Sequence, residues 1–439
     1  MSTVLSEHSV GLVEADRQVR PPSRRRLPVH DAQILVIGIN YQPEPTGIAP
    51  YTTGLAEHLA GIARSVTVLT GLPHYPSWQV PDQYRGRLRR RDLVTDRMRV
   101  VRHAHYVPGR QTVFTRAGYE MTFLANVLTS PAPAPDLVLA VSPSLGGAVA
   151  GACVATRFGA PLITVVQDLM AKAAGQSGIS GGGSVSGMTA KLERYALRRS
   201  TLVAPVSEAF IPPLRDYGVP ADRIRVLPNW AHITPAPYDV AGARRQLGWS
   251  DDGVIALHTG NMGLKQDLGN VISAARLLRS RSDISFILLG DGSQRAALEV
   301  QAADLPNVRF VDPLTEQLYP QALAAADLFL VNERASVGDM SLPSKLTSYL
   351  SAGRPVLAAV GSDGATAREL ERTAGAAMRV EPGAPHALAE SVTILAADAR
   401  QREGMAAAGR AFADAYLGQA AAMERVTALV NEALLWPPA

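Results

Sequence analysis

Two successive series of short apolar segments, separated by helical stretches, constrain the fold of this chain more than any other sequence feature. The first series comprises ILVIGI (34–39), VTVLTG (66–71), MRVVRH (98–103), DLVLAVS (136–142), PLITVVQD (161–168), TLVAP (201–205) and IRVLPNW (224–230). The second comprises VIALHTG (254–260), ISFILLGDG (284–292), VRFVDPL (308–314), DLFLVNE (327–333) and RPVLAAV (354–360). Continuous apolar strands alternating with helices are typical of parallel sheets covered on both faces. The sequence therefore predicts an α/β protein with two doubly wound domains.

The length of 439 residues also fits two domains. We expect a disordered tail over 1–30, an N-terminal domain over 31–232 and a C-terminal domain over 233–418. A final helix over 419–439 is expected to pack back on the N-terminal domain. The connection near 231–245 contains the proline-rich ITPAPYD and is predicted to be a linker. Ligands of doubly wound sheets bind at the carboxyl ends of the strands, so two facing domains predict a site in the cleft between them.

Glycine and serine dominate the stretch GQSGISGGGSVSG (175–187), which predicts a flexible segment, followed by a helix over 188–200. An uncharged apolar stretch over 137–155 is long enough for a membrane helix. Ser142-Pro143-Ser144 interrupts it, so a buried strand, a turn and a small-residue helix are favoured. The tail over 1–30 has no apolar run typical of a signal peptide. We therefore expect a cytoplasmic location.

Composition excludes several kinds of site. Cys153 is the single cysteine, so neither an intrachain disulfide nor a cysteine-based metal site can form. Arginines cluster over 85–91. A solvated loop is one interpretation, and attraction to an anionic membrane surface or a lipid-diphosphate acceptor is the other. Nucleic acid is disfavoured as a partner, because no aromatic residues interleave with these arginines.

Two of the four lysines lie in segments that suit phosphate groups. Lys265 follows a glycine turn in HTGNMGLKQ (258–266), and Lys345 stands at a predicted helix start in SLPSKLTSYL (341–350). Glycine turns let backbone amides approach an anion, and a lysine adds a point charge. We therefore predict phosphate binding at both, with helix capping as the alternative for Lys265. Lys191, like Lys172, has no such sequence context.

A third loop, INYQPEPTGIAPYT (39–52), leaves the first strand and enters a helix through Thr46-Gly47. A small residue at a helix start favours an anion, although a proline-stiffened tight turn would show the same pattern.

Together these segments resemble the family 4 glycosyltransferases, and within them the colanic-acid-type enzymes of exopolysaccharide biosynthesis, from about residue 32 to the C-terminus. The resemblance is carried by GINYQPEPTGIAPYT (38–52), GLPHYPSW (71–78), VVQDL (165–169), LPNW (227–230), GNMGLKQ (260–266), GDG (290–292) and LPSKLTSYL (342–350). It implies the GT-B fold, with two Rossmann-like domains facing a central cleft. It also implies transfer of a sugar from a UDP- or GDP-sugar to a saccharide or lipid-linked acceptor, with retention and without a metal or other cofactor.

The resemblance assigns donor-side roles as well. Gly47 matches the glycine whose backbone faces the donor diphosphate, and Lys265 matches the lysine that neutralises it. Ser344 and Lys345 match the helix start at the distal phosphate. The remaining residues of the predicted donor site are Gly260, Asn261, Gly263, Gly290, Pro343, and the nucleobase loop of Asp312, Pro313 and Leu314.

The sequence departs from the family pattern at several positions. Asn261 stands where many members have arginine, and Gln167 stands where a histidine is usual. Met340 and Ser348 occupy the register of the family's Glu-x7-Glu pair. The departures put the sugar-contacting residues in question.

A retaining transfer needs charge relief at the leaving diphosphate, which preplaced cations and amides supply. The catalytic candidates are therefore Lys265 and Lys345, with Gln167 as a sugar-orienting amide and Asp168 as the adjacent carboxylate. Asp168 would act as a base only in an inverting enzyme, and a structural strand-end carboxylate is the alternative.

On the acceptor side, the candidates are Thr46, His74, Tyr75 and Trp78, whose aromatic rings suit a sugar surface or simple loop packing. Two rival functions remain: a nucleotide-sugar epimerase of GT-B fold, and a non-catalytic GT-B partner subunit. The lead hypothesis places a transferase peripherally on the inner face of the membrane.

Overall fold

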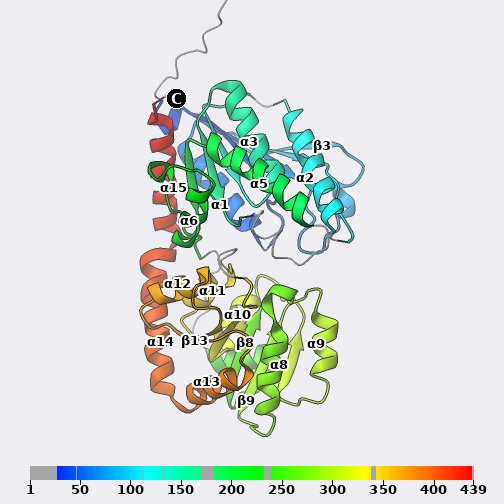
Figure 1. Cartoon of the computed structure of the whole chain (residues 1–439), viewed down its shortest axis with the longest axis vertical. Coiled ribbons are helices and arrows are strands. Elements are labelled where there is room, and N and C mark those ends of the chain that lie inside the picture. Colours follow the sequence, from blue (N-terminus) through cyan, green and yellow to red (C-terminus); the bar gives the residue numbers. More distant parts are fainter. Residues whose placement is uncertain are drawn as a thin grey trace, which may run out of the picture.

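The computed structural model describes residues 27–45, 47–110, 112–131, 133–169, 182–231, 239–337 and 343–437. Two α/β domains lie end to end, and a column of C-terminal helices runs along one side of both (Figure 1). Both sheets are doubly wound and almost entirely parallel. Among the described residues, no helix is both long enough and apolar enough to span a membrane.

The N-terminal sheet has seven strands in the order β3-β4-β2-β1-β5-β6-β7, and only the edge strand β3 runs antiparallel. Its strands are β1 (Gln33–Ile37), β2 (Ser65–Gly71), β3 (Arg89–Thr95), β4 (Met98–His103), β5 (Leu137–Val141), β6 (Leu162–Val166) and β7 (Leu202–Pro205). Side chains of β1 alternate between the two faces, and both faces are buried, which explains the continuous apolar run.

Helices cover both faces of this sheet. One face is covered by α1 (Ala49–Ile62), and the other by α2 (Val113–Leu128), α3 (Leu145–Phe158) and α5 (Gly182–Arg199). The short α6 (Ile211–Asp216) follows β7. β5, the turn at Ser142 and α3 together occupy the stretch 137–155, which confirms the strand-turn-helix prediction and not the membrane helix.

The C-terminal sheet has six parallel strands in the order β10-β9-β8-β11-β12-β13. They are β8 (Val254–Thr259), β9 (Ile284–Leu289), β10 (Val308–Val311), β11 (Leu328–Asn332), β12 (Val356–Ala359) and β13 (Ala377–Val380). One face is covered by α7 (Val240–Leu247), α10 (Tyr319–Ala325), α11 (Lys345–Ser351) and α12 (Ala365–Arg372). The other is covered by α8 (Leu268–Leu277), α9 (Arg295–Gln301) and α13 (Pro385–Ala397).

The chain returns to the N-terminal domain at its end. α14 (Ala399–Phe412) leads through a π-helical turn (Ala413–Leu417) into α15 (Gln419–Leu435). The apolar face of α15 belongs to the same core cluster as α1 and β1. Arg225 forms a bidentate ion pair with Glu432, and His58 hydrogen-bonds Thr427 at 2.8 Å. α15 therefore ties the last residues of the chain to the first domain.

Three local predictions need correction. The segment 224–230 is not a regular strand. Ile224 bridges to Val203, and the backbone N–H of Leu227 still donates to the Pro205 carbonyl, but β7 itself ends at Pro205, so the pairing stops there. The predicted linker extends too far, because residues from 240 onward form α7; most of ITPAPYD lies outside the described residues. The arginines of 89–91 lie on the edge strand β3 and not in a loop.

The fourth correction concerns the glycine-rich segment. Residues 175–181 lie outside the described residues, but 182–187 belong to α5, which begins six residues before the predicted helix. Ala196 and Leu197 anchor α5 in the domain core. Once a helix is anchored, extending it costs little per residue, so glycine does not stop it.

Candidate functional site

Loops from the facing ends of both domains carry the predicted site residues. They follow β1, β2 and β6 in the N-terminal domain, and β8, β9, β10 and β11 in the C-terminal domain. Lys265 lowers the pKa of Asp168 across the domain boundary, and Ala365 of α12 packs into the cluster around Phe210 of the N-terminal domain. The structure thus brings together the carboxyl ends of two doubly wound sheets, where such folds bind ligands.

Lys345 is the first residue of α11, and its side chain reaches back to β8. Its Nζ donates to Nε2 of the buried His258 at 3.4 Å. Burial lowers the pKa of Lys345 to about 7, while the nearby Glu333 carboxylate acts to raise it. Burial, and then the charge of Lys345, hold the pKa of His258 well below its usual value, so its ring is neutral and can accept this hydrogen bond.

Lys265 lies on the short 3-10 turn Leu264–Gln266 and is exposed. Its carbonyl accepts a hydrogen bond at 3.0 Å from the backbone N–H of Arg334, which follows β11. Its ammonium group acts electrostatically on both Asp168 and Glu333. The two predicted lysines therefore converge on one region.

Glu333 is a site residue that the sequence analysis missed. It directly follows β11, and its Oε1 accepts a hydrogen bond at 2.9 Å from Thr366 Oγ1. Burial raises its pKa to about 7, opposed by the Thr366 hydrogen bond and by Lys345 and Lys265. Its position at the end of the predicted strand DLFLVNE was the sequence signal that could have identified it as a site residue. Of the family-register positions, Ser348 is buried within α11, and Met340 lies outside the described residues.

Glycines hold the β8 and β9 loops in backbone contact. Gly260 has φ +97°, and among the described residues an added Cβ there would approach Lys345, whose Cε would lie 3.9 Å away. A Cβ at Gly290 would collide with the Gly260 carbonyl. Gly263 donates its N–H to the Gln266 side chain at 3.1 Å. Gly290 is thus required for loop packing, and Gly260 presents open backbone beneath Lys345.

The other donor-side residues lie around this loop. Asn261 and Ser344 are exposed, Pro343 is half-buried, and Ser344 makes no side-chain cap on α11. Asp312 pairs with Arg295 at 2.7 Å, which fixes the start of the Asp312–Leu314 loop after β10.

Glu44 connects the two predicted loops of the N-terminal domain and was also missed. Its Oε1 accepts the backbone N–H groups of His74 at 2.8 Å and Tyr75 at 3.0 Å. Gly47 has φ +72°, and an added Cβ would come within 3.0 Å of the Tyr75 ring. The loop before α1 therefore lies against the GLPHYPSW segment. Thr46 lies outside the described residues.

His74 does not form an exposed acceptor surface. It is 2% exposed, its Nδ1 donates to the Leu72 carbonyl at 2.9 Å, and its Nε2 accepts from the Tyr119 hydroxyl at 3.0 Å. Its ring packs against Trp78 and His105. This is the loop-packing alternative, while Tyr75 and Trp78 remain half-buried.

Gln167 and Asp168 have different environments. The amide of Gln167 exchanges two hydrogen bonds with Asn229 of the LPNW segment, at 2.9 and 2.7 Å. That pairing holds the end of β6 against the segment after β7 and occupies one donor and one acceptor of Gln167. Burial raises the pKa of Asp168 to about 7, and Lys265 opposes this shift.

Comparisons with known proteins agree with this geometry. A "Glycosyl transferase 4-like domain" model matches residues 46–230, and a "Glycosyl transferases group 1" model matches 253–398. The colanic acid biosynthesis glycosyl transferase WcaI of Escherichia coli K12 is 33% identical over 383 residues, covering 84% of this chain and 91% of that protein. A GDP-mannose-dependent monoacylated alpha-(1-6)-phosphatidylinositol monomannoside mannosyltransferase of Corynebacterium glutamicum is 29% identical over 45% of this chain and 53% of its own length.

Solved structures show the same fold. Anabaena HepE in complex with UDP aligns with a TM-score of 0.67 at 17% identity, covering 91% of this chain and all of that one. WaaG, a glycosyltransferase involved in lipopolysaccharide biosynthesis, aligns with a TM-score of 0.64 at 18% identity, covering 90% and 99%. With both family models matched and a relative at 33% identity along most of the chain, this protein belongs to the group 1 glycosyltransferases and has their two-domain GT-B fold.

Proposed function

We propose that this protein transfers a sugar from a nucleotide diphosphate donor to a lipid-linked saccharide acceptor, with retention and without a metal, in exopolysaccharide assembly. The observation that carries the proposal is the convergence of Lys265 and Lys345 on the Gly260 turn, at the boundary with the Asp168 loop. Preplaced cations of this kind stabilise the charge that grows on a departing diphosphate.

The relatives support the two substrates. Two structures of the same Anabaena protein are described as complexes with UDP and UDP-glucose, and the Corynebacterium relative is named for GDP-mannose and a phosphatidylinositol mannoside. WcaI is named for colanic acid biosynthesis. A UDP- or GDP-sugar and an acceptor carried on a lipid are therefore the substrates that we propose.

In the proposed reaction, the lysines bind the leaving diphosphate and the diphosphate takes the acceptor proton. The ammonium groups of Lys345 and Lys265 and the backbone at Gly260 bind the diphosphate as the bond to the anomeric carbon breaks. The acceptor hydroxyl attacks from the same face, and its proton passes to the departing diphosphate oxygen. This route needs no strong protein base, which leaves Asp168 free to orient Lys265 by its charge.

The test measures transfer and product together. A panel of UDP- and GDP-sugars is first screened for protection against thermal unfolding, because ligands of the folded state raise its stability. The best donor is then incubated with membrane lipid extract in EDTA, and the anomeric configuration of the product is read by NMR. A product with the donor's configuration supports the proposal. An inverted product would overturn retention, and dependence on added metal would overturn metal independence. Release of an epimerised nucleotide sugar would overturn the transferase assignment. Absence of donor binding would overturn the proposed donor class.

We also propose that β3 and the two residues before it contact an anionic membrane. Leu88 and Leu93 are 81% and 69% exposed, and Arg87 and Arg91 beside them are exposed as well. Basic and apolar side chains together suit a lipid surface. Arg87→Glu with Arg91→Glu should weaken sedimentation with phosphatidylglycerol vesicles, and added salt should weaken the parent likewise, because screening acts over about 8 Å at physiological ionic strength. Vesicle binding equal to the parent's would leave β3 as a solvated edge.

A further inference from the structure

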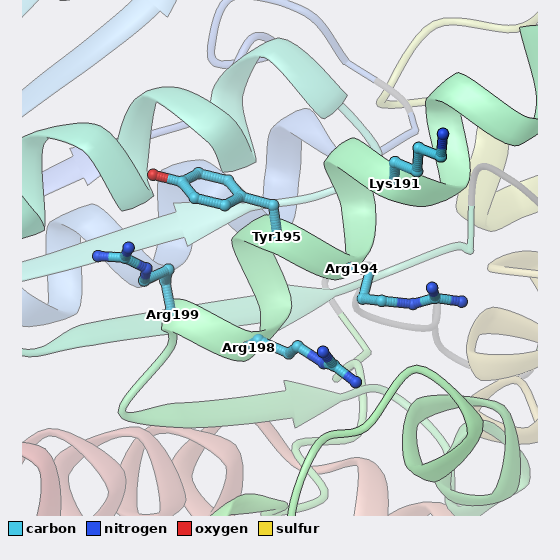
Figure 2. A pocket seen from close by; sticks show the side chains of 5 residues that line it. All are labelled: Lys191, Arg194, Tyr195, Arg198 and Arg199. Atoms are coloured by element: carbon cyan, nitrogen blue, oxygen red, sulfur yellow. The ribbon is translucent and has the colours of Figure 1, made fainter.

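A cationic surface on α5 lies outside the donor site. Lys191, Arg194, Tyr195, Arg198 and Arg199 line a surface pocket of about 330 Å³. Their spacing of three and four residues places them on one side of the helix. In Figure 2, Tyr195 and Arg199 flank one side of the helix axis, Arg194 and Arg198 flank the other, and Lys191 lies nearer the start of α5.

No carboxylate of the described residues pairs with the positive charges of this surface. Glu193, the acidic residue of α5, is buried and interacts with Tyr217 instead. Like charges spaced three or four residues apart destabilise a helix, so an anion bound here would relieve an existing repulsion.

Several contacts hold the cations in place without cancelling their charge. Arg198 Nε donates to the Tyr217 carbonyl at 3.0 Å, and Arg194 lies over the Tyr217 ring at 5.9 Å. Arg199 lies over the Tyr195 ring at 5.4 Å. Ordered cations lose less conformational entropy when a ligand binds, which favours a specific anion site.

Apolar side chains border the cations. Met188 is 61% exposed and Tyr195 is 38% exposed on α5, and Phe158 is 38% exposed at the end of α3, against which α5 packs. Four clustered cations exceed the single negative charge of an ordinary phospholipid head group and suit a diphosphate. The exposed apolar groups suit the first part of a lipid chain.

We propose that this α5 surface binds the diphosphate of the lipid carrier that bears the acceptor. The inference rests on the proposed lipid-linked acceptor and places its head group on the N-terminal domain, away from the donor lysines. It also changes the interpretation of Lys191, which has no phosphate-binding context in the sequence.

The test uses farnesyl diphosphate as a soluble lipid diphosphate, with the full-length protein. Lys191→Gln with Arg194→Gln removes two cations that donate no hydrogen bond to another described residue, so folding should be retained. Arg245→Gln with Arg400→Gln, two exposed arginines of the C-terminal domain, removes the same charge elsewhere. We expect the α5 variant to bind farnesyl diphosphate at least roughly tenfold more weakly than the parent, and the control to match the parent.

Two other ligands distinguish a lipid diphosphate from free pyrophosphate and from a general anionic membrane. Inorganic pyrophosphate should bind more weakly than farnesyl diphosphate, because it lacks the lipid chain. Loss of phosphatidylglycerol vesicle binding without loss of farnesyl diphosphate binding would overturn the proposal in favour of general membrane attraction. Equal farnesyl diphosphate binding by parent and α5 variant would overturn it outright. Donor protection against thermal unfolding should be unchanged in the α5 variant, so failure of the donor assay reports separately on the proposed function.

Discussion

Replacing Glu333 with glutamine tests whether the site depends on a charged Lys345. The substitution removes the carboxylate charge but keeps an oxygen that can accept the Thr366 hydrogen bond. Burial lowers the pKa of Lys345 to about 7, and the Glu333 charge is what acts to raise it. Without that charge the pKa of Lys345 should fall further, by about one unit or more, as is usual on losing a close opposite charge.

The expected size follows from the charged fraction of Lys345. With a pKa of about 7, roughly half of the free enzyme carries the charge at pH 7. A fall of one unit leaves roughly a tenth, so kcat/KM for the donor should drop about fivefold at pH 7 and about tenfold at pH 8. Near pH 5.5 parent and variant should differ by less than about twofold, because most of Lys345 is charged in both.

The assay is the pH profile of kcat/KM and kcat between pH 5.5 and 9. Since kcat/KM reports ionisations of the free enzyme, its alkaline limb should move to lower pH in the variant. The limb of kcat should move less, because a bound diphosphate keeps Lys345 charged. Glu371→Gln, an exposed change on α12, is the matched control. A variant profile that superimposes on the parent's, or that moves to higher pH, would refute the reasoning.

Substitutions at four further residues test other parts of the site. Lys265→Ala and Lys345→Ala should each lower kcat/KM for the donor by roughly ten- to a few hundredfold, since each charge-assisted contact contributes about 1.5–3 kcal/mol. Full activity of either variant in steady-state kinetics would contradict this. Asp168→Asn should raise Tm at pH 8 and leave it unchanged at pH 4. The pKa of Asp168 in the folded protein, about 7, lies above its ordinary 3.8. Its contribution to stability is therefore present at low pH and is lost as pH rises through 7, at a cost of up to about 4 kcal/mol. A lower Tm of the variant at pH 8 would show instead that the ionised carboxylate is stabilising. Glu44→Ala should lower the free energy of unfolding by roughly 2–5 kcal/mol, because two backbone N–H groups lose their acceptor, whereas Glu44→Gln should recover part of this in urea denaturation; equal stability of the two variants would contradict it.

The architecture could be predicted from the pattern of apolar runs. These runs became the strands at the centre of each sheet, because parallel strands covered on both faces can accept only apolar side chains. The loops carrying Gly47, Lys265 and Lys345 were placed correctly at the facing ends of the domains, because each follows a strand or begins a helix that the local pattern marks.

Edges of the sheets were less predictable. The solvent-exposed β3 carries no apolar run, so its pairing with β4 left no signal in the sequence. The apolar segment 224–230 has the pattern of a strand, but it pairs only briefly, because the neighbouring β7 ends at Pro205. A local sequence pattern indicates whether side chains are buried. It indicates strand pairing only where the paired strand is also buried.

Tertiary structure alone decided which polar groups meet. Glu333 joins Lys345 and Lys265 because β11 ends beside α11 and the turn after β8, which no spacing in the sequence could reveal. Glu44 and His74, thirty residues apart, became partners because β1 and β2 are neighbours in the sheet. The pKa values of such groups depend on burial and on charges brought together from distant parts of the chain, so only the folded molecule could assign them.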